Sequence, residues 1–189
     1  TYEYKTVLTK PVISVIKQIV QHFNYQGPLG LGYPGVVMHG VTKTAANIDA
    51  GWINFTASRQ IALATNCEVT IRNDADVAGI AEMYHGAGKG VTGVVMIFTL
   101  GTGIGSVMFV DGNIVPNLEL GHLYLRGMKK DAEFYAAERV RLEKGLSWKK
   151  WGERLNVYFQ HIEFLFSPDL IILGGGASKN HDKFMPYLD

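Results

Sequence analysis

Residues 94–106 read Val-Val-Met-Ile-Phe-Thr-Leu-Gly-Thr-Gly-Ile-Gly-Ser, an apolar run that ends in a glycine turn. The segment that follows, Ile104 to Val110, is rich in β-branched and aromatic residues and leads to the turn Asp111-Gly112-Asn113, which is typical of a second strand. A dinucleotide-binding fold needs a helix directly after its glycine turn, because the helix N-terminus binds the pyrophosphate. The stretch therefore predicts strand, glycine turn, strand, and argues against a Rossmann-type site.

The glycine turn Gly101-Thr102-Gly103-Ile104-Gly105 has the composition of a phosphate-binding loop. Without side chains, its backbone N–H groups can approach an anion closely, and the Thr102 hydroxyl adds a donor. It is not a Walker loop, because the only Gly-Lys pair, Gly88-Lys89, is followed by Gly90 instead of Ser or Thr. On this motif alone, an ordinary glycine-bearing hairpin is an equally good interpretation.

A second candidate motif is Asn73-Asp74-Ala75-Asp76. Asp74 follows the short apolar strand Val69-Thr70-Ile71 and precedes a helical stretch from Val77 to His85, so we expect it at a strand-to-helix corner. Open α/β sheets bind ligands at such corners, and a carboxylate there can accept a hydroxyl proton. Asn-Asp before a helix is also a normal capping pair, which leaves a structural interpretation open for the motif taken alone.

A third motif, Glu119-Leu120-Gly121-His122, follows the glycine turn. The three segments occur in an order that would supply a base, a phosphate loop and sugar-binding groups to one site. Together they resemble the ROK family of sugar kinases, and within it the polyphosphate glucokinase branch.

The resemblance extends from about Gly27 to the C-terminus. Tyr33-Pro34-Gly35-Val36-Val37, followed by Thr44-Ala45-Ala46-Asn47-Ile48-Asp49 and Trp52, looks like the sugar-binding loop of that branch. Gly145-Leu146-Ser147-Trp148 and Leu173-Gly174-Gly175-Gly176-Ala177-Ser178 resemble its later helices and its nucleotide-end loop.

The resemblance implies a role for each matching residue. Asp74 would be the catalytic base that takes the proton of the attacking sugar hydroxyl. The sugar would be bound by Gly35, Asn47, Asn73, Glu119, His122 and Glu133. The transferring phosphates and the nucleotide would be bound by Gly101, Thr102, Gly103, Gly105, Gly174, Gly175 and Gly176.

The chain lacks the cysteine-rich zinc motif that many ROK members carry after Glu-x-Gly-His. Its one cysteine, Cys67, lies far from that position, so no zinc site is expected. The segment from Tyr124 to Glu133 takes the place of the motif, and Glu133 is expected to replace the sugar-contacting glutamate that otherwise ends it. The expected metal is Mg²⁺, which would bridge the phosphates of ATP or polyphosphate.

The first phosphate-binding motif of the family, Asp-x-Gly-Gly-[Ser/Thr], does not occur in the sequence. Thr1-Tyr2-Glu3-Tyr4-Lys5 is typical of the end of a strand, and Asp189 precedes the helix that normally returns to the first domain. The resemblance therefore predicts a fragment, and leaves its own activity open.

Composition indicates a globular chain with little overall charge. It has 189 residues, 47% of them apolar, enough to bury roughly 70% of the unfolded surface as one unit. Lys and Arg number 18 against 17 Asp and Glu, so no nucleic-acid or membrane partner is expected. No apolar run approaches the roughly 18 residues of a membrane span, and a single cysteine fits a reducing cytoplasm.

Positive charge nevertheless gathers in one part of the sequence. Between Arg126 and Arg154 lie nine of the 18 basic residues and five acids. A chain of phosphates would find counter-charges there, although a solvated helix face is the commoner explanation of such a cluster.

The pattern of apolar residues predicts a mixed α/β chain. In residues 1–75 we expect a helix from Pro11 to about Asn24, strands at 30–33 and 68–71, and a helix at 55–64. In residues 76–189 we expect strands at 93–100 and 104–110, helices at 131–144 and 147–166, a buried strand at 169–173 and a final helix. The resemblance implies a ribonuclease-H-like, actin-type ATPase fold of two α/β domains, with the first incomplete at its N-terminus.

The sequence thus predicts a cytoplasmic glucokinase that moves a terminal phosphate from polyphosphate or ATP to the 6-hydroxyl of glucose, with a homodimer as one option for its assembly. Two alternatives stay open: a non-catalytic sugar-sensing domain of a ROK-type transcriptional regulator, and an inactive fragment of a sugar kinase. The sequence does not decide between the two phosphate donors, or between glucose and mannose.

Overall fold

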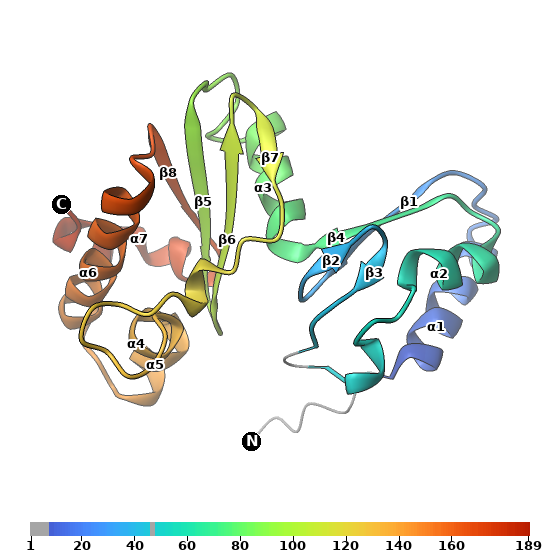
Figure 1. Ribbon diagram of the computed structural model, residues 1–189, viewed down its shortest axis with the longest axis horizontal. Helices are drawn as coiled ribbons and strands as arrows, with labels where there is room; N and C mark the ends of the chain where they lie inside the picture. Colours follow the sequence, from blue (N-terminus) through green and yellow to red (C-terminus); the bar gives the residue numbers. More distant parts are fainter. Residues whose placement is uncertain (1–7, 46–47) are drawn as a thin grey trace. The chain divides into compact units, whose positions relative to one another are not determined.

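The computed structural model describes residues 8–45 and 48–189 (Figure 1). The chain divides into two compact units, of which the first ends at Val77 and the second begins at Ala78. The sequence predicts this boundary after Ala75. The strand end expected at Thr1-Tyr2-Glu3-Tyr4-Lys5 and the sugar ligand expected at Asn47 both lie outside the described residues.

The first unit contains a two-stranded parallel sheet, a short antiparallel hairpin and two helices that pack together. Strand β1 pairs in parallel with β4, and β2 pairs with β3 to form the hairpin. The elements are α1 (Thr9–His22), β1 (Leu29–Tyr33), β2 (Val37–Met38), β3 (Val41–Thr42), the 3-10 helix η1 (Ala50–Trp52), α2 (Ala57–Thr65) and β4 (Val69–Asn73).

The helices and parallel strands of the first unit form where the sequence predicts them. Pro11 lies in the first turn of α1, where its missing N–H costs nothing. Helix α2 ends at Asn66, which adopts a left-handed conformation (φ 56°) and donates its N–H to the Ala62 carbonyl. Trp52, expected in the sugar loop, is buried with Tyr33 and Ile71 in the core of this unit.

The second unit is built on a mixed four-stranded sheet in the order β7-β6-β5-β8. Strand β5 pairs antiparallel with β6 and in parallel with β8, which confirms the predicted strand, glycine turn and strand. Helix α3 (Asp74–His85) leads into this unit, and the elements after it are β5 (Val94–Leu100), β6 (Ile104–Val110), β7 (Asn113–Val115), η2 (Leu120–His122), α4 (Glu133–Ala136), α5 (Glu138–Glu143), α6 (Trp148–Phe166), β8 (Leu170–Gly174), η3 (Gly176–Asn180), α7 (His181–Phe184) and η4 (Met185–Tyr187).

The central strand β5 is covered on both faces, as Figure 1 shows, by α3 on one side and by α6 on the other. Because side chains alternate along a strand, Val95 and Ile97 pack with Ile80 and Met83 of α3. The intervening residues, with Phe98 at their centre, join the larger core under α6. Burial on both faces explains why β5 is a continuous apolar run.

Helix α6 supplies many of the side chains that cover the Phe98 face of β5. Ser147 caps the helix by accepting the N–H of Lys150 at 3.2 Å. Helix α6 carries aromatic and aliphatic residues at helical spacing, and this stripe is core along most of its length, because Trp151, Leu155, Tyr158 and Ile162 are fully buried. Leu165, at the end of the stripe, is 48% exposed.

The single helix predicted over residues 131–144 is wrong: α4 and α5 are separate, and Ala137 between them has an extended backbone (φ −60°, ψ 150°). Two backbone groups that would bond to each other's neighbours within a continuous helix have partners outside it instead. The Ala136 carbonyl accepts from the Trp151 indole at 2.9 Å, and the Arg139 N–H donates to the Gly101 carbonyl at 3.1 Å. Tertiary hydrogen bonds thus override the local helical preference.

Two further expectations near the C-terminus need correction. Strand β8 is half-buried along its whole length rather than buried, because it has a neighbouring strand on one side only among the described residues. The final helix expected after Gly176 consists of three short pieces, η3, α7 and η4. Within the described residues, no helix is both long and apolar enough to cross a membrane.

Leu155→Ala tests the packing of α6 on the sheet. Since Leu155 is fully buried, the substitution should leave a cavity and lower the free energy of unfolding by about 2–5 kcal/mol. Denaturant titration followed by tryptophan fluorescence measures the loss, because Trp148 and Trp151 lie on the same helix. Leu142→Ala is the control: Leu142 is 63% exposed, and we expect a change of about 0.5 kcal/mol or less. Similar losses in both variants would contradict the packing described.

Candidate active site

The strand-to-helix corner expected at Asp74 is confirmed, since β4 ends at Asn73 and α3 begins at Asp74. Asn73 is buried, and its Oδ1 accepts the N–H groups of Ala75 at 2.7 Å and Asp76 at 3.2 Å, which caps the helix. Asp74 is exposed at the start of the helix, and its Oδ1 accepts the Ala75 N–H at 2.9 Å. The corner therefore presents one carboxylate to solvent on a fixed backbone.

Asn73 also ties this corner to the expected sugar loop, because its Nδ2 donates to the Gly35 carbonyl at 3.1 Å. The loop itself is closed by Thr44, whose carbonyl accepts from the Tyr33 hydroxyl at 2.7 Å and whose Oγ1 accepts the Val36 N–H at 2.9 Å. Burial raises the pKa of Tyr33 above its ordinary value. The first unit thus brings Gly35, Asn73 and Asp74 together, with most of the hydrogen-bonding capacity of Asn73 used to hold the backbone.

The glycine turn of the second unit uses one of its backbone donors and leaves two open. The Gly101 N–H donates to the Gly103 carbonyl at 3.1 Å, whereas the N–H groups of Thr102 and Gly103 donate to no other group in the described parts of the chain. Open N–H groups on a turn are the arrangement that binds anions. Gly105, expected at the phosphates, instead lies inside β6, where it pairs with Thr99.

Arg139 holds this turn, a role that the sequence did not suggest. Its N–H donates to Gly101, as described above, and its Nε donates to the Thr102 carbonyl at 3.0 Å. Its Nη1 lies 3.1 Å from a carboxylate oxygen of Glu143. A guanidinium is thereby fixed within one hydrogen bond of the turn.

The second glycine loop lies beside the first. Strand β8 ends at Gly174, which pairs with Thr99 of the parallel neighbour β5, so both loops occur at the carboxyl ends of adjacent strands. Gly175 has φ +82°, and a Cβ on it would lie 2.6 Å from the backbone N and O of Leu100. Only glycine allows this approach, and Gly176 then begins η3.

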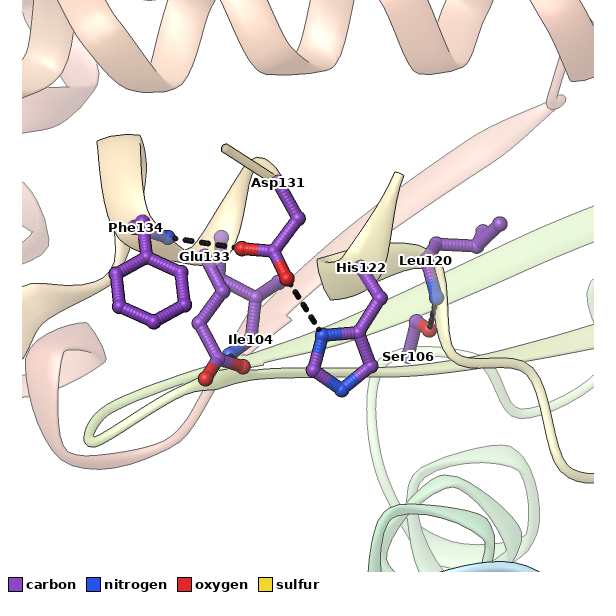
Figure 2. Close-up of polar contacts among 7 residues, drawn as sticks. All are labelled: Ile104, Ser106, Leu120, His122, Asp131, Glu133 and Phe134. Atoms are coloured by element: carbon purple, nitrogen blue, oxygen red, sulfur yellow. Dashed lines mark hydrogen bonds and ion pairs between the residues drawn. The ribbon is translucent and has the colours of Figure 1, made fainter. Parts of the chain in front are cut away.

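Ser106 anchors the segment that carries Glu119 and His122. It is buried in β6, and its hydroxyl donates to the Leu118 carbonyl at 2.9 Å. The same hydroxyl accepts the Leu120 N–H at 3.0 Å (Figure 2). In the sequence, Ser106 stands out only as the last residue of the glycine stretch. A lone hydroxyl on a strand buried among apolar residues was the signal that could have identified it, since such a group needs a partner.

His122 is paired with Asp131, which sequence reasoning also did not single out. The imidazole Nδ1 lies 2.9 Å from Asp131 Oδ2 (Figure 2). This hydrogen bond is the largest cause of a raised His122 pKa; partial burial opposes it, and the charges of Glu133, Asp131 and Glu119 add to it. Both Glu119 and His122 are exposed.

Glu133 joins the His122 segment to the glycine turn. As the first residue of α4, it accepts the Ile104 N–H, the first of β6 after the turn, at 3.0 Å. Its charge also contributes to raising the pKa of the buried Tyr158 hydroxyl, mainly a burial effect. The second unit therefore brings together both glycine loops, Glu133 and the imidazole.

Three arginines of the basic cluster, Arg139, Arg141 and Arg154, are engaged in internal contacts. Arg141 stacks over Trp148 at 3.8 Å from the ring centroid and lies 3.6 Å from Glu138, while Arg154 donates to the Tyr135 carbonyl at 3.1 Å. Lys129 is exposed, and so is Lys130. The cluster is thus partly structural, with the lysines left as surface charges.

Metal-binding capacity is limited to isolated carboxylates in the part of the chain that the structure describes. There, no group of three or more His, Cys, Asp or Glu side chains could hold a metal ion. Mg²⁺ in phosphate-transferring sites needs only one or two carboxylates, because substrate phosphates supply the other ligands. Glu133, at the glycine turn, is a carboxylate of this kind.

Comparison with known proteins gives several close relatives. A polyphosphate glucokinase of Mycobacterium tuberculosis (strain CDC 1551 / Oshkosh) is 45% identical over 179 residues, which cover 94% of this chain and 67% of that protein. A polyphosphate glucokinase of Mycobacterium leprae is 43% identical, and the chain spans 55% of its length. The crystal structure of an inorganic polyphosphate/ATP-glucomannokinase from Arthrobacter sp. strain KM matches with a TM-score of 0.86 at 42% identity, over 96% of this chain and 74% of that one.

These matches show the ribonuclease-H-like, actin-type ATPase fold that the family resemblance implied. The model of the ROK family matches residues 1–139. Together with the mycobacterial sequences, this match shows that the chain belongs to the ROK family.

Proposed function

We propose that the chain is a glucokinase-type phosphotransferase, which moves the terminal phosphate of polyphosphate or ATP to the 6-hydroxyl of glucose. The observation that carries the proposal is the arrangement in the second unit: a turn with open N–H groups, a second glycine loop beside it, and Glu133 bonded to the first residue after the turn. The polyphosphate glucokinases that share 45% of its residues support the same reaction.

The sugar would be bound by groups that accept or exchange hydrogen bonds with adjacent hydroxyls. Glu119, His122 and Glu133 would offer two carboxylates and an imidazole, and the other expected sugar ligands are Gly35, Asn47 and Asn73. A site built from such acceptors rejects analogues that lack a hydroxyl, because the protein group would remain unpaired. The hydrogen bonds of Asn73 to Gly35 and to α3 support a role in holding the loop and the base in position.

Asp74 would act as the base. Its carboxylate takes the proton of the 6-hydroxyl as that oxygen forms a bond to the terminal phosphorus, and the bond from phosphorus to the donor oxygen breaks. The leaving group is ADP when ATP is the donor, and a chain shortened by one phosphate when polyphosphate is the donor. The exposed position of Asp74 on a capped helix start supports this role.

The donor phosphates would bind to the N–H groups of Thr102 and Gly103, with Gly101 in the same turn and Gly174, Gly175 and Gly176 at the nucleotide end. Arg139 would place positive charge at this turn. Bound Mg²⁺ would neutralise charge on the phosphates, which would themselves supply ligands to it. Positioning and charge stabilisation are what phosphoryl transfer asks of a protein.

Location and assembly are further parts of the proposal. We propose a cytoplasmic location. It is supported by the proposed substrates, which are cytoplasmic metabolites, and by Cys67, a buried thiol that forms no disulfide. A homodimer is supported by apolar side chains exposed on α6, where Phe164 is 81% and Leu165 48% exposed.

The activity itself is tested by incubating the protein with glucose and Mg²⁺, with ATP or polyphosphate as donor, and measuring glucose 6-phosphate in a coupled assay. We expect saturable, glucose-dependent formation of glucose 6-phosphate with at least one of the two donors. Glucose binding in calorimetry without product from either donor would contradict the proposal and favour a sugar sensor.

Asp74→Asn should lower kcat by about 10²–10⁴-fold and leave the KM for glucose within about tenfold, because the amide keeps the shape of the side chain but cannot take the proton. Asp182→Asn is a matched control, since Asp182 is also an exposed aspartate in the first turn of a helix. Steady-state kinetics of both variants decide the role, and a kcat of Asp74→Asn within about threefold of the parent would exclude the base.

Gly175→Ala should raise the KM for ATP, because the new Cβ meets the Leu100 backbone and the left-handed conformation costs about 1–3 kcal/mol. Gly112→Ala is the control: it has nearly the same conformation (φ +77°) with nothing within 4 Å of the new Cβ. Donor KM values measured at saturating glucose should therefore separate the two variants. An unchanged KM in Gly175→Ala would remove this loop from the donor site.

A further inference from the structure

Asp131 is held in a position that its own hydrogen bonds define. The Ala132 N–H donates to the Leu123 carbonyl at 2.8 Å, which closes the segment between them and brings Asp131 next to His122. Asp131 Oδ1 accepts the Phe134 N–H at 3.3 Å, and Oδ2 lies 2.9 Å from His122 Nδ1. The Asp131 side chain is 14% exposed, whereas that of His122 is 56% exposed. A half-buried carboxylate therefore orients an accessible ring.

This contact decides which ring nitrogen carries the proton. A carboxylate only accepts hydrogen bonds, so Nδ1 of His122 must be the donor toward Asp131. In the neutral ring, Nε2 then has a free lone pair. Figure 2 shows Nε2 pointing away from Asp131, so the outer side of the ring is an acceptor.

We propose that Asp131 is a positioning residue, which fixes the orientation and tautomer of His122 so that Nε2 accepts a hydrogen bond from a sugar hydroxyl. The inference rests on the proposed function for the identity of the ligand. It adds a specificity determinant, because an acceptor at this point selects a group that can donate.

Three carboxylates act on the ring: Asp131 through the hydrogen bond, and Glu119 and Glu133 through their charges. They raise the His122 pKa, so the neutral acceptor form is present above that raised pKa and the donating imidazolium below it. Affinity for the sugar should accordingly decline as the pH falls through the raised value, since Nε2 then carries a proton.

The substitution Asp131→Asn distinguishes a role in fixing the tautomer of His122 from a merely structural role. The Phe134 N–H engages Oδ1, so in the variant the amide oxygen should keep that place and the amide NH₂ should face His122. An NH₂ group can only donate, so Nδ1 becomes the acceptor and the proton moves to Nε2. The polarity presented to the sugar is thus inverted with little change in shape.

Nitrogen-15 NMR of histidine-labelled full chain reads the tautomer directly, with the signal assigned by its absence in His122→Gln. We expect Nδ1-H in the parent and Nε2-H in Asp131→Asn, with a lower His122 pKa in the variant. The same tautomer and the same pKa in both proteins would overturn the proposal. This readout needs no catalysis, so it stands or falls separately from the kinase activity.

Kinetics then test the consequence for the sugar. Asp131→Asn should raise the KM for glucose about tenfold, the size of one hydrogen bond, with a smaller change in kcat. In a His122→Gln background the same substitution should have no further effect, because its partner is gone. An equal loss in both backgrounds, or a loss confined to thermal stability, would show a merely structural role and overturn the proposal. Asp182→Asn, which should change neither the KM nor the tautomer, is the control.

Discussion

Burial of β5 on both faces is the constraint on which the second unit depends. Because Val95 and Ile97 are covered by α3 while Phe98 is covered by α6, the strand can be neither shifted by one residue nor moved to an edge without exposing apolar side chains. Its carboxyl end is therefore fixed in space. Both glycine loops start from that end of the sheet, so their close approach follows from the packing of the strand rather than from contacts between the loops alone.

The helical region after residue 130 belongs to the core and to the site at the same time. The break at Ala137 releases the Arg139 N–H toward Gly101 and the Ala136 carbonyl toward the Trp151 indole. Glu133 on α4 bonds the first residue of β6 on the other side of the same turn. The turn is thus held by two helices at once, which keeps its own N–H groups available for a ligand.

Sequence reasoning succeeded where a local pattern carries the information. The apolar run and the glycine turn predicted the β5–β6 hairpin, and a short apolar strand followed by a helical stretch predicted the corner at Asp74. Ser106, Asp131 and Arg139 were missed because their partners lie 9 to 37 residues away in the chain, and one sequence does not show which distant groups meet. The helix predicted over 131–144 failed for the same reason, since bonds to the glycine turn and to Trp151 decide where it breaks.

The attachment of Arg139 to the glycine turn also has a consequence for how the protein opens. A single short helix, α5, supplies both the N–H that binds Gly101 and the guanidinium that binds Thr102. Short helices open locally at a lower free energy than a buried central strand. When α5 frays, the turn loses two anchors in one event, although β5 stays folded. Amide hydrogen exchange around residue 139 would then report on the donor loop well below the temperature at which the sheet melts, and a bound polyanion would slow that exchange by keeping the turn closed.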